Sequence, residues 1–264
     1  MLEKRERNTF DPTRNMDNKP VISIPENPSR IIMVFRAVTG SVGGTKIDGF
    51  TRRVQRYDPT VGVVGLYDTT KLCYMIGADG IGDFDETIDY LQGMMDDHPG
   101  ARLTTVGFSL GGFGALQYGI RLRAERITAL NPWTGLTDEC FALDPRGKRA
   151  FDYARSHLPG DDGRDVVQLL ERIGFDGQIN LFYSGGNPGD VFQSGRIKDY
   201  PFVNLYETDA SSHADSAFIL LRYGPEYYES LGLKLTERQK ERLREKNRLQ
   251  LELKLADKEG ARAE

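Results

Sequence analysis

A serine between two glycines offers the clearest chemistry in this sequence. Ser109 is the centre of GFSLG at residues 107–111, which directly follows an apolar run and directly precedes a helical pattern. A serine on a sharp strand-to-helix turn has a strained backbone, and its hydroxyl projects clear of the sheet. The glycines on either side let neighbouring backbone approach closely. The pattern therefore predicts a nucleophile for acyl transfer; a glycine-rich turn that only packs tightly is the alternative.

A serine hydroxyl is a weak nucleophile and needs a base, for which the chain offers three histidines. His98 stands in a turn after a predicted helix, and His157 lies in a segment without clear periodicity. His213 lies in the loop after the last predicted strand, and loops at strand ends are where a base can reach Ser109. We therefore expect His213 to be the base, and a histidine of the surface or the core is the alternative.

An acidic side chain must orient the base and stabilise its charged form. Asp190 follows a predicted strand, and the chain order Ser109, Asp190, His213 is the nucleophile–acid–base order of one fold group. We therefore expect Asp190 to be this acid. A turn aspartate after Pro-Gly is the alternative for this residue. Asp209 and Asp215 are the other candidates, each so near the histidine that its own loop must supply the contact.

Two backbone N–H groups are expected to bind the oxyanion that forms during acyl transfer. Leu110, directly after the serine, supplies one, because the helix that follows directs its positive end and its free N–H groups at the site. Arg36 or Ala37, after the strand predicted at 31–35, supplies the second, and the residue types do not choose between them. The side chain of Arg36 faces either an anionic substrate or solvent. Trp133, after another strand end, either walls the acyl pocket or is a core residue.

Apolar runs that alternate with helical patterns indicate the fold that positions these residues. Strands are predicted at 21–24, 31–35, 61–67, 103–106, 127–130, 179–183 and 203–206, and helices at 47–57, 84–97, 114–122, 166–173 and 215–221. Asp83 and Glu86 predict a capping box at the start of the second helix. The alternation predicts an α/β fold, a mostly parallel sheet with helices on both faces. Ligands of such sheets bind beyond the carboxyl ends of the strands.

Composition divides the chain into three parts. Residues 1–20 are expected to form a flexible arm, residues 21–232 one domain, and residues 233–264 a charged helical tail. Within the domain, residues 133–163 are expected to be irregular and to lie over the strand ends as a small lid. Alternating leucines at 249, 251, 253 and 255 make a strand the competing interpretation in the tail. We expect the tail to be either a solvated helix or a contact between copies in a homo-oligomer.

Taken together, these features resemble the α/β-hydrolase superfamily over about residues 21–224. The segment GFSLGGFGAL at 107–116 is similar to the nucleophile elbow of the esterase D and feruloyl-esterase branch. The chain departs from the lipase-like branch, because FRAVTG at 35–40 stands where a His-Gly-Gly-Gly motif would. The resemblance implies a serine hydrolase that cleaves an ester or thioester through an acyl-enzyme. An acyltransferase with the same triad and a non-catalytic binding or assembly protein are the alternatives.

Composition and motifs argue against several other functions. The 35 Lys and Arg residues are balanced by 39 Asp and Glu residues, which argues against a nucleic-acid binder with a basic surface. Zinc spacing, a P-loop lysine and a complete dinucleotide fingerprint are all missing, so we expect no metal and no cofactor. No apolar run reaches the length of about 18 residues that a membrane span needs, and residues 1–20 lack the apolar stretch of a signal peptide. We therefore expect a cytoplasmic enzyme that acts on a small-molecule or acylated substrate.

Overall fold

A twisted β-sheet forms the centre of the domain. The computed structural model describes residues 15–37, 41–42, 45–158, 163–214 and 216–263, and within them seven strands pair in the order β1-β5-β2-β6-β7-β8-β9. Their bounds are Val21–Ser23 (β1), Arg30–Phe35 (β2), Val61–Leu66 (β5), Arg102–Phe108 (β6), Arg126–Leu130 (β7), Gln178–Ser184 (β8) and Val203–Thr208 (β9). β1 runs antiparallel to β5, and the other neighbours in this sheet are parallel. The prediction of a mostly parallel sheet is confirmed.

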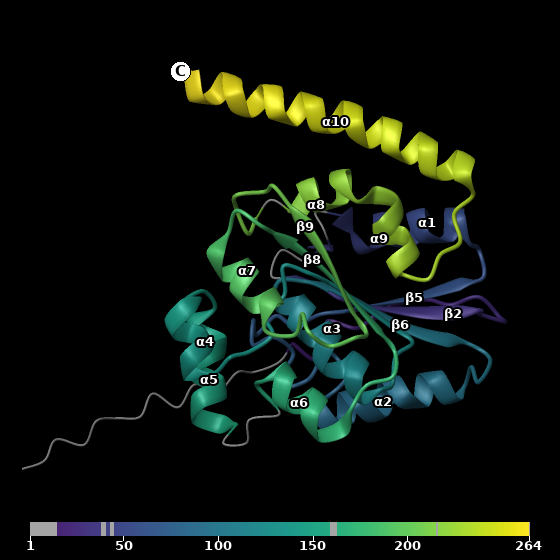
Figure 1. The fold of residues 1–264 in the computed structure, drawn as a ribbon. Coiled ribbons are helices and arrows are strands. Elements are labelled where there is room, and N and C mark those ends of the chain that lie inside the picture. Colours follow the sequence, from purple (N-terminus) through teal and green to yellow (C-terminus); the bar gives the residue numbers. More distant parts are fainter. Residues whose placement is uncertain (1–14, 38–40, 43–44, 159–162, 215, 264) are drawn as a thin grey trace, which may run out of the picture.

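Helices cover both faces of this sheet, as the sequence predicts (Figure 1). One face carries α1 (Ile47–Tyr57), α8 (Ser216–Arg222) and α9 (Gly224–Ser230), and the other carries α2 (Phe84–Asp96), α3 (Leu110–Arg121) and α6 (Val166–Ile173). The central strand β2 is buried along its whole length, and its side chains alternate between the two layers. Ile31 and Met33 belong to the apolar cluster under α3, whereas Ile32 and Val34 belong to the cluster under α1. This two-sided burial explains why β2 reads as a continuous apolar run.

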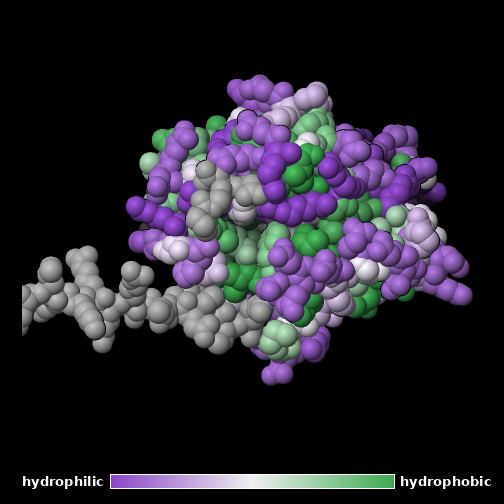
Figure 2. Space-filling view, turned by 90° about the horizontal axis from the view of Figure 1, so that it is seen from below, coloured by the Kyte–Doolittle hydropathy of each residue, from purple (hydrophilic) through white to green (hydrophobic). Residues whose placement is uncertain are grey.

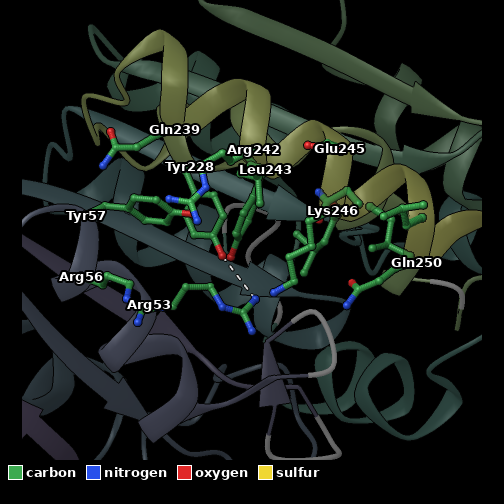
Figure 3. A pocket seen from close by; sticks show the side chains of 15 residues that line it. Arg53, Arg56, Tyr57, Tyr228, Gln239, Arg242, Leu243, Glu245, Lys246 and Gln250 are labelled. Carbon is green, nitrogen blue, oxygen red and sulfur yellow. Dashed lines mark hydrogen bonds between the residues drawn. The ribbon is translucent and has the colours of Figure 1, made fainter.

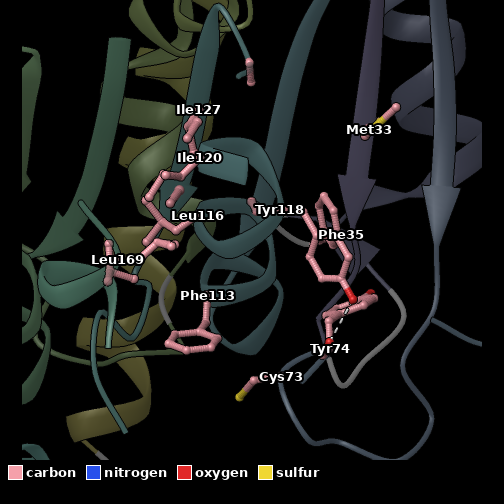
Figure 4. Packing of buried hydrophobic residues seen from close by; sticks show 14 of the residues in the cluster. Met33, Phe35, Cys73, Tyr74, Phe113, Leu116, Tyr118, Ile120, Ile127 and Leu169 are labelled. Atoms are coloured by element: carbon pink, nitrogen blue, oxygen red, sulfur yellow. Dashed lines mark hydrogen bonds between the residues drawn. The ribbon is translucent and has the colours of Figure 1, made fainter. Parts of the chain in front are cut away.

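The apolar cluster under α3 fixes the helix that follows Ser109. The ring of Phe35 packs against the rings of Tyr74 and Tyr118, with centroids 5.1 Å apart in each pair. Figure 4 shows these three rings together at one side of the cluster, with Leu116 of α3 at the other. Burying a large apolar side chain contributes about 1.5–3 kcal/mol to the free energy of unfolding. α3 is buried from its first residue almost to its end, so it is among the most firmly held elements of the domain.

α3 begins at Leu110, four residues before the predicted start at Gly114. Glycines at 111, 112 and 114 lower the helix propensity of this turn, which is why the sequence suggested a later start. In the structure each of these glycines has a neighbouring group where a Cβ would stand. The nearest atoms would lie 2.2 Å from a Cβ on Gly111, 2.9 Å on Gly112 and 2.8 Å on Gly114. Close packing against Phe35, Pro132 and Tyr74 therefore overrides the propensity.

The prediction that residues 133–163 are irregular is wrong. α4 (Asp138–Leu143) and α5 (Lys148–His157) lie in this segment, while residues 159–162 are outside the described part. Thr137 caps α4 by accepting a hydrogen bond from Cys140 N at 3.3 Å. Phe141 stacks on Phe151 with centroids 4.3 Å apart, so the two helices support each other. Helices this short depend on such tertiary contacts, which periodicity does not reveal. The lid role of the segment stays a prediction.

The charged tail forms a helix, α10 (Glu237–Ala263), and the competing strand at residues 249–255 is not observed. Thr236 caps its start, because Gln239 N donates to Thr236 Oγ1 at 3.2 Å. Asn247 Nδ2 donates to Leu220 O at 3.0 Å and ties the helix to α8. Figure 1 shows the C-terminal part of α10 standing clear of the domain. A contact between copies of the chain through α10 stays a prediction.

The face on the side of α2 and α6 is mostly polar (Figure 2). Figure 2 views the molecule from the side of α2 and α6 and shows hydrophilic residues on the outer ridges, with hydrophobic residues mainly in the hollows between them. Of the helices that the structure describes, none is both long and apolar enough to cross a membrane. The described end of the predicted arm contacts the domain, because Asn18 Nδ2 donates to Asp79 Oδ2 at 3.0 Å. The arm before residue 15 lies outside the described residues.

Two helical glycines test how tightly α3 packs on the sheet. A Cβ on Gly119 of α3 would lie 2.4 Å from Thr105 Oγ1, whereas a Cβ on Gly93 of α2 would meet nothing within 4 Å. We expect Gly119→Ala to lower the free energy of unfolding by about 1–3 kcal/mol through overpacking. Gly93→Ala should raise it by about 0.5–1 kcal/mol. Urea unfolding followed by circular dichroism measures both values, and equal stability of the two variants would contradict the packing described here.

Candidate active site

Ser109 occupies a sharp turn between β6 and α3. Its backbone has φ +57° and ψ −120°, a conformation that costs a residue with a side chain about 1–3 kcal/mol. Ser109 N donates to Leu130 O at 2.9 Å, and Phe113 N donates to Ser109 O at 3.2 Å. The end of β7 and the first turn of α3 therefore hold the strained residue from both sides. This is the backbone geometry that the glycine–serine pattern predicts.

The two glycines of the pattern stand where segments of backbone cross. A Cβ on Gly107 would lie 1.9 Å from Gly111 O, and a Cβ on Gly111 would lie 2.2 Å from Phe35 O. Any side chain at either position would collide with backbone, which cannot move aside as a flexible side chain can. The contact with Phe35 also brings the end of β2 against the start of α3. The glycines are thus a steric requirement of the turn.

The predicted oxyanion donors stand beside this turn. Leu110 is the first residue of α3, so its N–H is one of those that have no partner within the helix. Arg36 and Ala37 directly follow β2, and Arg36 O lies 2.9 Å from the Cβ position of Gly111. Tyr74 Oη donates to Arg36 O at 3.0 Å and fixes this peptide. The binding of an oxyanion by these N–H groups stays a prediction.

His213 and Asp190 reach the Ser109 turn from two other strand ends. His213 Nε2 lies 2.8 Å from Ser109 Oγ, and His213 Nδ1 lies 2.7 Å from Asp190 Oδ1. The three residues follow β6, β8 and β9, whose carboxyl ends share one edge of the parallel sheet. The Asp190 side chain is fully buried, and that of His213 is 21% exposed. The structure thus brings together the three side chains that the sequence singled out, at distances that allow direct proton transfer.

Asp190 lies in a helix that the sequence did not predict. α7 (Pro188–Gly195) begins directly after β8, and Asn187 caps it by accepting a hydrogen bond from Asp190 N at 3.1 Å. Asp190 is therefore in the first helical turn, not in a simple turn after Pro-Gly. Pro188 at the first helical position fits such a start. The cap and the helix together fix the direction from which the carboxylate meets His213.

The other candidate acids and histidines are placed elsewhere. Asp209 is exposed and forms an ion pair with Arg222 at 2.7 Å. Asp215 lies outside the described residues. His157 ends α5 and stacks on Tyr153 with centroids 4.4 Å apart. His98 stands in the turn after α2. Among the described histidines, the hydrogen bond to Ser109 therefore comes from His213.

Asn131 anchors the loop that carries His213, a role that the sequence did not assign. It is fully buried at the end of β7 and has a positive φ of 44°. Asn131 Nδ2 donates to His213 O at 2.9 Å, and Asn131 Oδ1 accepts from Ser184 N at 2.9 Å. Asparagine tolerates left-handed backbone and forms local hydrogen bonds. An asparagine before a proline at a strand end was the signal that could have indicated this position.

Two aromatic rings lie nearly parallel to the imidazole of His213. The centroid of Phe108 is 5.6 Å away at an interplanar angle of 24°, and that of Trp133 is 6.4 Å away at 20°. Trp133 is 7% exposed, and its Nε1 donates to Asp144 Oδ2 at 3.0 Å. Trp133 is therefore a packed residue that also lies beside the predicted base. Its contact with an acyl group stays a prediction.

Asp190 has a second partner, Arg146, which the sequence did not single out. Arg146 Nη1 donates to Asp190 Oδ1 at 2.9 Å, and Arg146 Nε donates to Asp144 Oδ1 at 2.5 Å. Burial opposes the charge on Asp144, but the bonds from Arg146 outweigh it and lower the pKa of the Asp144 carboxyl. Burial likewise opposes the charge on Arg146, yet the two carboxylates raise the pKa of its guanidinium. The pair is therefore fully ionised across the neutral range.

A large surface groove belongs to a different part of the molecule. It has a volume of about 990 Å³ and lies between α1 and α10, and residues of the Ser109 turn do not line it (Figure 3). Next to Arg146, the space among Trp133, Phe141 and Phe151 is too small to hold a water molecule. Within the described ranges, no group of three or more His, Cys, Asp and Glu side chains could hold a metal ion.

The strain at Ser109 is measurable without knowledge of a substrate. Ser109→Ala and Ser109→Gly both remove the hydroxyl, but only glycine adopts φ +57° without strain. We expect the free energy of unfolding of the Gly variant to be about 1 kcal/mol higher than that of the Ala variant. Glycine relieves the backbone strain of the folded state, and this gain exceeds the loss that comes from the greater conformational entropy of glycine in the unfolded chain. Thermal and urea unfolding compare the two variants directly. An alanine variant as stable as the glycine variant, or more so, would show that the turn is unstrained.

Comparisons with known proteins give the fold its name. No family model matches the chain, and the search of curated proteins finds no match. Among solved structures, the fluorophosphonate-binding serine hydrolase FphF of Staphylococcus aureus superposes with a TM-score of 0.53 at 12% identity, over 79% of this chain and 91% of its own. MGS-M2, an α/β hydrolase from a Medee basin deep-sea metagenome library, superposes with a TM-score of 0.54 at 11% identity, over 83% and 95%. MPT51 of Mycobacterium tuberculosis gives 0.52 at 9% identity, over 83% and 96%. The chain therefore has the α/β-hydrolase fold.

Proposed function

We propose that this protein is a serine hydrolase that cleaves an ester or a thioester. Ser109 is the nucleophile, His213 is the base, and Asp190 orients the base. One observation carries the proposal: the two hydrogen bonds of 2.8 and 2.7 Å that link the three side chains. A hydroxyl held at this distance from an imidazole, which is itself held by a carboxylate, is the arrangement that activates a serine. The solved hydrolases of the same fold support the proposal at the level of architecture.

Acylation uses each of these groups once. Ser109 Oγ attacks the carbonyl carbon of the substrate while His213 Nε2 accepts the hydroxyl proton. Asp190 Oδ1 accepts a hydrogen bond from His213 Nδ1 and stabilises the imidazolium that forms. The carbonyl oxygen becomes an oxyanion, to which the N–H of Leu110 and that of Arg36 or Ala37 donate. The tetrahedral intermediate then expels the alcohol or thiol, which takes the proton from His213 and leaves the acyl group on Ser109 Oγ.

Deacylation repeats the sequence with water. His213 Nε2 accepts a proton from a water molecule, whose oxygen attacks the acyl carbon. Collapse of the second tetrahedral intermediate releases the carboxylic acid and returns the proton to Ser109 Oγ. No redox step and no further reactant are needed, so the cycle requires no cofactor. Hydrolysis is proposed in preference to acyl transfer because water needs no acceptor site of its own.

The nucleophile is tested by Ser109→Ala. We expect this variant to lose at least about 1,000-fold in turnover of a p-nitrophenyl ester, because no other group can form the acyl-enzyme. It should also lose all labelling by a fluorophosphonate probe, while its circular dichroism spectrum stays that of the wild type. Unchanged turnover would refute the proposal. A folded wild-type protein that neither hydrolyses esters nor reacts with the probe would favour the binding or assembly role instead.

The acid is tested by a matched pair of substitutions. Asp190→Asn should slow turnover by about 10³–10⁴-fold, because an amide no longer holds the imidazole in the required tautomer. Asp209→Asn alters an exposed acid of the loop that carries His213 and should change turnover by less than about twofold. Both variants are assayed with the same ester under the same conditions. Similar losses in the two variants would show that Asp190 has no special role.

A further inference from the structure

One oxygen of Asp190 carries all of the side-chain hydrogen bonds of this carboxylate. His213 Nδ1 lies 2.7 Å from Asp190 Oδ1, and Arg146 Nη1 lies 2.9 Å from the same atom. Asp190 Oδ2 is buried, and among the described residues it has no hydrogen-bond partner. Within that part of the chain, Arg146 is also the only lysine or arginine in ion-pair contact with Asp190. The orientation of the acid therefore depends on two donors, one of which is the base itself.

A carboxylate held by the base alone would be poorly fixed. Rotation about its side-chain torsions could present Oδ2 to His213 in place of Oδ1. The bond from Arg146 opposes this rotation, because the guanidinium is planar and its donors point in fixed directions. The ion pair also packs directly on the start of α7, since a Cβ on Gly189 would lie 2.8 Å from Arg146 Nη2 and 2.9 Å from Asp144 Oδ1. Arg146 thus holds Asp190 from a direction different from that of His213.

Arg146 is itself held rigidly. Its Nε and Nη2 donate to the two oxygens of Asp144 at 2.5 and 2.7 Å, a bidentate pair. Asp144 Oδ2 in turn accepts from Trp133 Nε1 at 3.0 Å and from Gln193 Nε2 at 3.3 Å. Gln193 lies one turn after Asp190 on α7. The hydrogen bonds therefore lead back to the helix that carries the acid and to the ring beside the base.

We propose that Arg146 is a positioning residue of the active site, which holds Asp190 in the orientation that His213 requires. Asp144 acts with it by fixing the guanidinium. This role rests on the proposed function, because it has meaning only if His213 activates Ser109. Asp144 and Arg146 lie in the connection between α4 and α5, so this connection would contribute to catalysis although its residues contact no reacting atom. Its effect on the triad would pass through the ion pair between Arg146 and Asp190.

The test measures the reactivity of Ser109 without a natural substrate. The second-order rate constant for fluorophosphonate labelling is determined for the wild type, Arg146→Met and Arg146→Lys. We expect Arg146→Met to be labelled about 10- to 100-fold more slowly, because a small displacement of the triad has an effect of this size. Arg146→Lys should be intermediate, since an ammonium can reach one carboxylate but cannot bridge two as a guanidinium does. A side chain that only filled space would give Met and Lys variants of equal reactivity, and that result would overturn the proposal.

Arg196→Met is the matched control. Arg196 Nη2 forms a similarly buried ion pair with Asp165 Oδ2 at 2.7 Å in the same region, but the described contacts of this pair do not include Asp190. We expect Arg196→Met to lose stability and yet to be labelled within about twofold of the wild-type rate, because this pair has no direct hydrogen bond to Asp190 or His213 among the described contacts. If Arg196→Met is slowed as much as Arg146→Met, the loss is a general effect of breaking a buried pair, and the proposal fails.

Arg146→Met leaves Asp144 as a buried charge without its partner, which is itself destabilising. The double variant Arg146→Met/Asp144→Asn removes both charges and keeps the test valid if the single variant does not fold. A folded double variant labelled at the wild-type rate overturns the role of Arg146. If Ser109→Ala abolishes labelling while both Arg146 variants react like the wild type, only this inference is lost and the proposed function stands. If the wild type itself is not labelled at Ser109, the proposed function fails first.

Discussion

The strained turn at Ser109 is the constraint on which the rest of the site depends. A residue with φ +57° and ψ −120° is unfavourable by about 1–3 kcal/mol, and it persists only where its surroundings over-determine it. Here the surroundings are three: the carbonyl of Leu130 at the end of β7, the first turn of α3, and the backbone of Phe35 against Gly111. The contacts with Leu130 and Phe35 require that β7 and β2 lie on either side of β6 in a parallel sheet. The position of the Ser109 hydroxyl therefore depends on the order of the strands in the sheet.

A parallel sheet also explains how residues 104 positions apart come to touch. Ser109 and His213 each follow a strand, and parallel strands end at a common edge, so short loops are enough to bring their side chains together. The loops are then fixed by buried polar groups. Asn131 holds the backbone of His213, and Arg146 with Asp144 holds the carboxylate of Asp190. Buried hydrogen-bonded groups of this kind are costly to leave unpaired, which is what makes them rigid supports.

The sequence was informative where chemistry and periodicity coincide. Ser109 lies in a motif whose glycines are a steric requirement, and the three histidines were few enough to compare one by one. The capping box of Asp83 and Glu86 is confirmed, because it depends only on residues that are neighbours in the chain. Arg146 was beyond such reasoning, since its partner Asp190 is 44 residues away and neither has a local signature. The helices α4, α5, α7 and α9 were missed for a related reason: they are short, and contacts between elements stabilise them.

The central claim is that the hydroxyl of Ser109 forms a covalent intermediate with the help of His213. Mass spectrometry of the protein quenched during turnover of a p-nitrophenyl ester tests it most directly. The account predicts an added acyl mass on the peptide that contains Ser109, present in the wild type and absent when His213 is replaced by glutamine. Steady ester cleavage with an acyl group on another residue, or with the adduct formed equally fast without His213, would contradict it.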